Sequence, residues 1–192
     1  MYDPVTRKMH PHSPKYLAMH QIPHDFPKNP GEGSALRKWL EFIAPQEDIK
    51  MLLQFAGYCM TRDTRQQKML VLCGEGGTGK SLVIRLIEKM VGPENRSSIS
   101  IDQFSQRFAS FGLFGKILNS CADLKIKALE DTSTIKQIIG EDTIRGEAKG
   151  KDAISFQSCA KVIFSINQLP PVRDEKTEGF YRRLLILPMN RK

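Results

Sequence analysis

A glycine-rich stretch with one lysine carries the most specific chemistry in this sequence. Residues 74–81 fit the pattern GxxxxGK followed by Ser or Thr, between an apolar run and an amphipathic helix. Glycine amides can turn inward around phosphate oxygens, and the positive end of the following helix favours the same charge. We expect Lys80 to reach the β and γ phosphates of ATP, and the Ser81 hydroxyl to bind the Mg²⁺ that bridges them. The predicted nucleotide-binding residues, called the phosphate loop below, are Gly74, Glu75, Gly76, Gly77, Thr78, Gly79, Lys80 and Ser81.

Two polar residues that follow later apolar runs are candidates for the chemistry of hydrolysis. Kinases, transport ATPases, GTPases and motors share the phosphate loop, so the loop alone does not decide the reaction. We expect the Asp123 carboxylate at the tip of a strand neighbouring the loop, where it would hold magnesium or polarise the attacking water. Asn167 ends another run, and its amide could contact the γ phosphate and position water. Taken alone, each residue is also explained by its preference for turns.

A basic turn lies between these two predicted strands. Residues 143–156 predict two short strands joined by a glycine-centred turn, with Lys149 and Lys151 at its tip. Two ammonium groups beside a flexible glycine suit the backbone phosphates of single-stranded DNA, although lysines at hairpin tips are also often simply solvated. The tip has no aromatic residue, which argues against strong base stacking. Four upstream phenylalanines are predicted to pack in the core: Phe104, Phe108, Phe111 and Phe114.

The elements that must position these residues follow an α/β rhythm from about residue 66 onward. Short apolar runs alternate with glycine-bearing turns and amphipathic helices. This pattern predicts a phosphate-loop nucleotide-binding core with a parallel central sheet flanked by helices. The predicted strands are 69–73, 117–121, 161–166 and 184–187, and the predicted helices are 81–91 and 133–139.

A helical pair is predicted upstream, over residues 34–60. Ser34 is expected to cap the first helix, and the second follows Pro45. Gly57 is expected to let another backbone approach closely. The predicted apolar positions are Leu36, Trp39, Leu40 and Ile43 in the first helix, and Ile49, Leu52, Leu53, Ala56 and Cys59 in the second.

The first 33 residues are rich in proline and histidine. They predict extended structure packed on a neighbour, with a strand-like run at 16–19. All four histidines lie here, so a zinc site is conceivable. No cysteine or carboxylate completes a tetrahedral set at metal-binding spacing, which argues against such a site.

Composition bounds the partners and the compartment. The formal charge of +8 favours an anionic partner such as nucleic acid, although a basic surface can also serve solubility alone. The four cysteines stand far apart in apolar runs and are expected to be buried thiols, as suits a reducing cytosol. No run of about 18 apolar residues and no apolar signal core are present, so we expect a cytoplasmic protein without a membrane partner.

The ordered series of motifs resembles superfamily 3 helicases. It comprises the phosphate loop, GKILNSCADL at 115–124, FSINQLP at 164–170 and GFYRRLLILP at 179–188. The resemblance is strongest to the helicase part of phage, plasmid and poxvirus-type primase-helicases. HSPKYLAMHQIPHDF and the helical pair also resemble the region that precedes that motor, so the likeness covers nearly the whole chain.

The resemblance implies an AAA+-like ATPase that assembles as a ring, usually a hexamer. Each ATP would lie between subunits, and an arginine of the neighbouring copy would complete the site. Arg183 is the first candidate and Arg182 the second, because the family pattern fits both. The basic hairpin would project into the ring channel and track one DNA strand. Many family members have two acidic residues where this chain has Ala122 and Asp123, so magnesium binding and water activation are both left to Asp123.

We therefore predict an N-terminal segment, residues 1–65, before an ATPase and helicase domain, residues 66–192. It would use ATP and Mg²⁺ to move along single-stranded DNA during replication, in the bacterial host of a phage, plasmid or integrated element. An upstream priming domain or protein is the further expected partner. A DNA-binding initiator that hardly unwinds DNA, and a small-molecule kinase with the same loop, are the alternatives.

Overall fold

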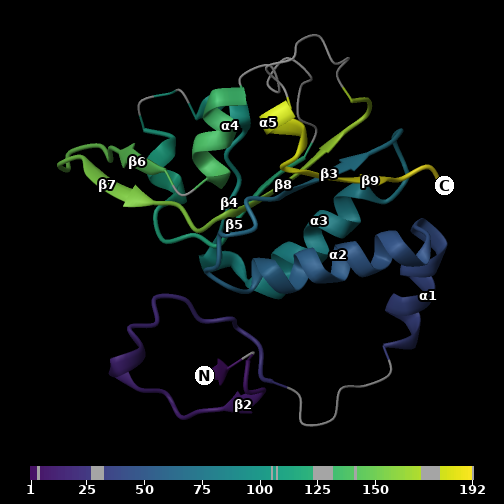
Figure 1. The fold of residues 1–192 in the computed structure, drawn as a ribbon, viewed down its shortest axis with the longest axis horizontal. Helices are drawn as coiled ribbons and strands as arrows, with labels where there is room; N and C mark the ends of the chain where they lie inside the picture. The colour runs from purple at the N-terminus through teal and green to yellow at the C-terminus, as the bar shows by residue number, and fades with distance from the viewer. Residues whose placement is uncertain are drawn as a thin grey trace.

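A five-stranded parallel sheet forms the centre of the molecule (Figure 1). The computed structural model describes residues 1–3, 5–26, 33–104, 106, 108–122, 132–140, 142–169 and 178–191. The strands of the sheet, in spatial order, are β4 (Arg96–Ser97), β5 (Leu118–Cys121), β8 (Lys161–Ile166), β3 (Met69–Cys73) and β9 (Leu184–Pro188). All neighbouring pairs are parallel, so the predicted fold class is confirmed. Four of these strands were predicted, and the two-residue β4 was not.

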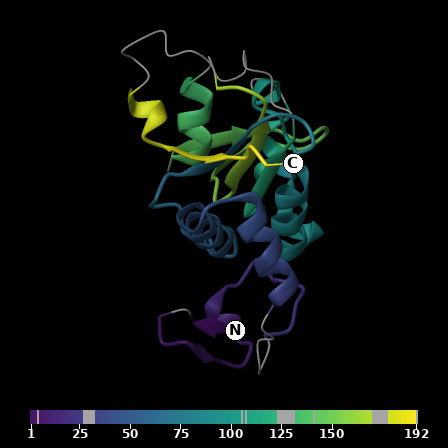
Figure 2. The ribbon, with the colours of Figure 1, turned by 90° about the vertical axis from the view of Figure 1, so that its right-hand side faces the viewer.

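Helices cover both faces of the sheet (Figures 1 and 2). On one face lie α1 (Ser34–Ile43), α2 (Gln46–Cys59) and α3 (Lys80–Val91), and on the other lie α4 (Thr132–Ile139) and α5 (Glu178–Tyr181). Successive side chains of a strand point to opposite faces. Accordingly, Leu70 and Leu72 of β3 belong to the core under α1–α3, whereas Met69 and Val71 belong to the core under α4 and α5.

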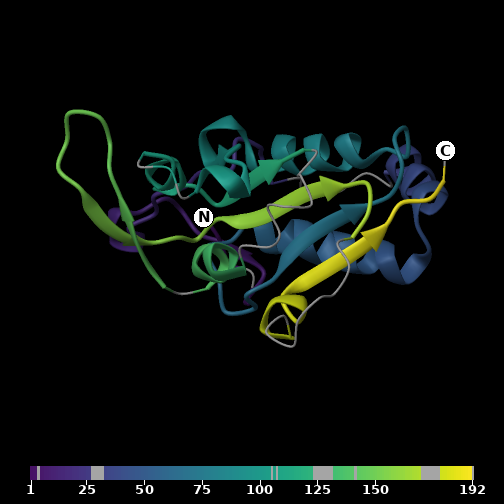
Figure 3. The ribbon, with the colours of Figure 1, turned by 90° about the horizontal axis from the view of Figure 1, so that it is seen from above.

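A two-stranded hairpin projects from the sheet (Figure 3). It consists of β6 (Thr143–Gly146) and β7 (Ile154–Gln157), which pair in the antiparallel sense as predicted. Its base is fixed to the short 3-10 helix η4 (Ser110–Leu113), because the Ser110 hydroxyl donates to the Arg145 carbonyl at 2.9 Å. The hairpin tip is therefore carried on an anchored stem.

The helical pair differs from its prediction in detail. The N-cap of α1 is Gly33, and Ser34 already lies within the helix, so the expectation that Ser34 caps it is wrong. A Cβ at Gly57 would meet nothing within 4 Å among the described residues, so the expected close backbone approach is also wrong. Leu36 and Leu53 are exposed, which makes the buried stripes narrower than predicted. The remaining buried residues place both helices in one core with the sheet.

The N-terminal segment packs on the far end of α3, as expected for an extended segment. His24 Nε2 donates to the Lys89 carbonyl at 2.8 Å, His20 Nε2 donates to the Gly115 carbonyl at 3.1 Å, and Asn95 Nδ2 donates to the Gln21 carbonyl at 2.8 Å. Residues 16–19 form no strand, so that prediction is wrong. The elements found here are β1 (Tyr2–Asp3), β2 (Lys8–Met9) and the 3-10 helix η1 (Pro14–Tyr16).

A buried lysine joins α2 to the amino end of β8. The Lys161 ammonium donates to the carbonyls of Thr61 and Cys159 and lies 4.7 Å from the centre of the Tyr58 ring. Burial lowers the pKa of Lys161 to about 8. Burial likewise raises the pKa of the neighbouring Cys59 thiol to about 12. Only Cys59 is fully buried; Cys73, Cys121 and Cys159 are free thiols that are partly exposed, in contrast to the prediction for all four.

Candidate functional site

The phosphate loop leaves β3 at the carboxyl edge of the sheet and enters α3. Its first residue is wedged between the ends of the two neighbouring strands. The Gly74 N–H donates to the Ile166 carbonyl at 3.2 Å, and the Met189 N–H donates to the Cys73 carbonyl at 2.7 Å. A Cβ at Gly74 would lie 2.0 Å from the Met189 carbonyl oxygen, so only glycine fits there. The tight start of the loop is thus set by β8 and β9.

The curvature of the loop depends on two further glycines. Gly77 and Gly79 have φ angles of 84° and 89°, which side chains with a Cβ rarely adopt. The Thr78 hydroxyl closes the turn by donating to the Glu75 carbonyl at 2.9 Å. Ser81 is exposed in the first turn of α3, where the N–H groups have no intrahelical partners. The loop therefore has the backbone form that a phosphate group requires.

Lys80 lies under the loop and is 6% exposed. Its Nζ donates to the carbonyls of Gly74 and Glu75 at 2.6 and 2.8 Å, and it lies 3.5 Å from Asn167 Oδ1. A buried ammonium needs such partners, because an unpaired charge in the interior is strongly unfavourable. These three oxygens hold the lysine at the mouth of the loop, where it can exchange a carbonyl for a phosphate oxygen.

Asn167 follows β8 directly and is exposed at the carboxyl edge. Because β8 pairs with β3, Asn167 and the phosphate loop share this edge, and the 3.5 Å approach to Lys80 brings the two predicted site residues together. The Cys73 thiol faces the Asn167 carbonyl at 3.9 Å. An amide in this position can orient a water molecule or contact a terminal phosphate without adding charge.

Asp123 lies outside the described residues. The strand that precedes it, β5, ends at Cys121 on the same edge of the sheet, and Ala122 is exposed there. β8 lies between β5 and β3, so β5 and the strand that leads into the loop are not direct neighbours in the sheet. At roughly 4.8 Å per strand step, β5 and β3 are about 10 Å apart. The carboxyl end of β5 therefore adjoins that of β8, which Asn167 follows.

The two arginines before β9 lie at the opposite edge of the sheet. Leu184 pairs with Met69 and Pro188 pairs with Cys73, so Arg183 is level with Lys68 and lies about 20 Å along the strand direction from Gly74, the first residue of the loop. The Arg183 guanidinium donates to the Gly179 carbonyl and to Gln67 Oε1 at 3.1 Å. Burial, and then the charge of Arg182, lower the pKa of Arg183.

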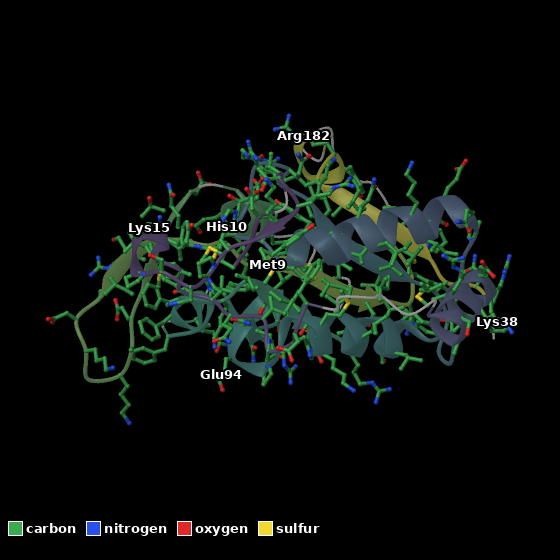
Figure 4. All side chains as sticks on the ribbon, turned by 90° about the horizontal axis from the view of Figure 1, so that it is seen from below. Met9, His10, Lys15, Lys38, Glu94 and Arg182 are labelled. Carbon is green, nitrogen blue, oxygen red and sulfur yellow. The ribbon has the colours of Figure 1, made fainter. Side chains whose placement is uncertain are left out.

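Arg182 differs from Arg183 in its surroundings. Its side chain is exposed and points out from the edge of the molecule in Figure 4. Its backbone is fixed, because the Lys68 ammonium donates to the Arg182 carbonyl. An exposed guanidinium on a fixed backbone is available to a neighbouring molecule, whereas that of Arg183 has partners within the chain.

Lys149 and Lys151 are exposed in the loop that joins β6 and β7. The Lys151 N–H donates to the Ala148 carbonyl at 3.1 Å, which closes a turn around Gly150. A shallow pocket of about 560 Å³ is lined by Phe108, Lys149, Lys151 and their neighbours. The tip thus combines two exposed lysines with a nearby aromatic ring.

The exposure of Phe108 contradicts the prediction that all four phenylalanines pack in the core. Phe104 is buried, but Phe108 and Phe114 are 49% and 43% exposed. Phe114 instead contacts Phe111 and Phe156 at ring-centre distances of 5.9 and 5.3 Å, beside the hairpin stem. Sequence spacing could not reveal this, because the contact depends on where the hairpin lies.

Among the described residues, the phosphate loop offers a candidate ligand for a metal ion. Within the part of the chain that the structure describes, no three His, Cys, Asp or Glu side chains form a group that could hold a metal ion. The Ser81 hydroxyl is the described candidate for Mg²⁺, and the Asp123 carboxylate lies outside the described residues. None of the helices in the described ranges is both long and apolar enough to cross a membrane.

A protein-family model spans this whole site. Residues 72–183, more than half of the chain, match a family described as a family of unknown function (DUF5906). The chain belongs to this family. The matched segment begins in β3 and ends at Arg183, so it contains the phosphate loop, the basic hairpin and both arginines.

Individual proteins of known name or structure are also similar to this chain. The chain is 27% identical over 158 residues to the putative helicase L207/L206 of Acanthamoeba polyphaga mimivirus, covering 78% of this chain and 16% of that protein. The NrS-1 C-terminal region matches with a TM-score of 0.64 at 18% identity, over 90% of this chain and 39% of the other. The JCV helicase matches with a TM-score of 0.57 at 11% identity, over 80% and 44%.

The chain thus spans less than half the length of these relatives. The structural likenesses establish the fold, which this chain shares with the NrS-1 C-terminal region and the JCV helicase. The predicted resemblance to superfamily 3 helicases is confirmed as a resemblance. The division at residues 65 and 66 stays a prediction.

Proposed function

We propose that this chain is the ATP-hydrolysing motor of a DNA helicase of the superfamily 3 type. The observation that carries the proposal is the contact of the buried Lys80 ammonium with Gly74, Glu75 and Asn167. It joins a phosphate-binding group and a water-orienting group at one point of the sheet edge. A simple phosphate-binding turn has no need of the second group.

In this proposal each side chain has a separate task. Lys80 and the N–H groups of the loop bind the phosphates, and Lys80 offsets the charge that grows on the terminal phosphoryl group. Asn167 orients the attacking water. Ser81 and Asp123 would hold Mg²⁺, which would supply Lewis-acid chemistry when bound. Asp123 also has the task of polarising water.

Completion of the site requires a second copy of the chain. Both arginines are remote from the loop of their own chain, which suits an arginine supplied in trans in a ring, such as a hexamer. Arg182 is the favoured residue, because its guanidinium is exposed while that of Arg183 bonds within the chain. The task of Arg183 is then to hold α5 and the start of β9 in position. In a longer protein the motor would work beside an upstream priming domain.

Single-stranded DNA would be held by the basic hairpin. Lys149 and Lys151 project on an anchored stem, and their charge suits backbone phosphates of any sequence. The formal charge of +8 supports the same class of partner.

The test is the rate of ATP hydrolysis with and without single-stranded DNA, for the wild type and for Lys149→Ala combined with Lys151→Ala. We expect DNA to stimulate the wild type, and the double variant to lose this stimulation while its ATP affinity is unchanged. Lys50→Ala combined with Lys89→Ala removes two exposed lysines elsewhere and should behave as the wild type. Equal stimulation of the hairpin variant would refute the DNA contact. Phosphate transfer to a small molecule, indifferent to DNA, would identify a kinase instead.

A further inference from the structure

A tryptophan approaches the last glycine of the phosphate loop. Trp39 is the single tryptophan of the chain and belongs to α1. A Cβ at Gly79 would lie 3.7 Å from Trp39 Cζ2 and 3.6 Å from Met189 Cε, so both side chains reach the last glycine before Lys80. Trp39 is only partly buried. An aromatic ring with accessible surface therefore borders the loop.

The support beneath this ring is rigid. Leu40 and Ile43 fix α1 in the core under the sheet. Arg191 joins the C-terminal end of the chain to the end of α1, because its guanidinium donates to the carbonyls of Glu41 and Phe42, each at 3.0 Å. Figures 1 and 2 show α1 and the C-terminal end of the chain at the same end of the molecule. The helix that carries Trp39 is thus joined to the C-terminal segment, whose Met189 also approaches Gly79.

The chemistry of a nucleotide explains why such a ring would stand there. The loop and Lys80 satisfy the charge of a triphosphate, but they offer nothing to its base. A base needs a flat or apolar surface next to the phosphates, and aromatic side chains provide one. Leu82 adds an apolar side chain, 46% exposed, in the first turn of α3. Simple packing against the loop would require neither the accessible ring surface nor an exposed leucine.

We infer that Trp39 forms one wall of a subsite for the base of the nucleoside triphosphate. This inference rests on the proposed function, since it assigns the base end of the same ligand. It makes Trp39 a binding residue that acts on affinity and base selectivity and takes no part in bond cleavage.

The test compares a ligand that has a base with one that lacks it. Isothermal titration calorimetry with Mg²⁺ would measure the Kd of ATP and of inorganic tripolyphosphate for the wild type, Trp39→Ala, Phe42→Ala and Lys80→Ala. Loss of stacking should weaken ATP roughly 3- to 10-fold in Trp39→Ala. Tripolyphosphate should bind this variant as it binds the wild type, which also shows that the variant is folded. Phe42→Ala removes an exposed ring of the same helix and should leave both Kd values unchanged.

A second pair of variants covers the case in which Trp39→Ala does not fold. Trp39→Phe keeps an aromatic face, whereas Trp39→Leu keeps only apolar volume. The inference therefore predicts that Trp39→Phe binds ATP more tightly than Trp39→Leu does, and that both variants bind tripolyphosphate with the same Kd. Equal ATP affinity in this pair, or an equal change for ATP and tripolyphosphate in Trp39→Ala, would overturn the inference alone. If Lys80→Ala changed neither Kd, the proposed function would fail, and the base subsite with it.

Discussion

Replacing Gly74 by alanine should destabilise the fold by an amount that the geometry of the loop sets. The added Cβ would lie 2.0 Å from the Met189 carbonyl oxygen, so the chain must move by about 1 Å or more to reach normal contact. That movement strains two hydrogen bonds, from Gly74 to Ile166 and from Met189 to Cys73. Two weakened bonds and the overpacking together amount to about 2–5 kcal/mol of the free energy of unfolding.

Two other glycines of the same loop make a graded control. Gly77→Ala meets no atom within 4 Å but must adopt a φ of 84°, which costs about 1–2 kcal/mol. Gly76→Ala has open space and no such φ, so its effect should stay within about 0.5 kcal/mol. Urea unfolding followed by circular dichroism gives all three values. A Gly74→Ala midpoint equal to that of Gly76→Ala would refute the wedge of the loop between β8 and β9.

Two further predictions concern charged groups away from the loop. Because burial lowers the pKa of Lys161 from 10.5 to about 8, the unfolded chain binds more protons than the folded chain between these pH values. Between pH 7 and pH 9 the free energy of unfolding, measured with urea, should therefore rise by about 1 kcal/mol more in the wild type than in Lys161→Met. If the free energy of unfolding changed with pH by the same amount in both proteins, the prediction would be wrong. Arg182→Ala should slow ATP hydrolysis about 10³-fold while ATP affinity is retained, as expected for an arginine acting in trans. Arg183→Ala should instead lower the free energy of unfolding by about 1–3 kcal/mol through its lost hydrogen bonds, and the reverse pattern would exchange the two roles.

The parts of the fold that follow local rules were predictable from the sequence. β3 and β8 have the predicted bounds, because each is a short, mainly apolar run that ends at a glycine or an asparagine. α3 begins at the loop lysine, since glycines before it and a regular apolar period after it leave little choice. Each of these features depends on residues that are close together in the sequence.

What the sequence could not give depends on contacts across the chain. The order of strands sets β8 between β5 and β3, and nothing in the run before Asp123 encodes that distance. The spacing of the phenylalanines predicts Phe108 in the core, because spacing cannot show that the hairpin passes beside it. The apolar spacing predicts Trp39 as one member of a core stripe, but it cannot show that its ring borders Gly79, 40 residues further along the chain.

The central claim is that Lys80 and Asn167 act together on one terminal phosphate. A double-mutant cycle on the rate of phosphate release from ATP, with Lys80→Ala, Asn167→Ala and their combination, measures this directly. Each single variant should be slower by about 10²-fold or more, and the double variant hardly slower than the worse single one. If the two effects multiplied instead, or if the wild type released phosphate no faster than Lys80→Ala, the contact at 3.5 Å would have no catalytic meaning.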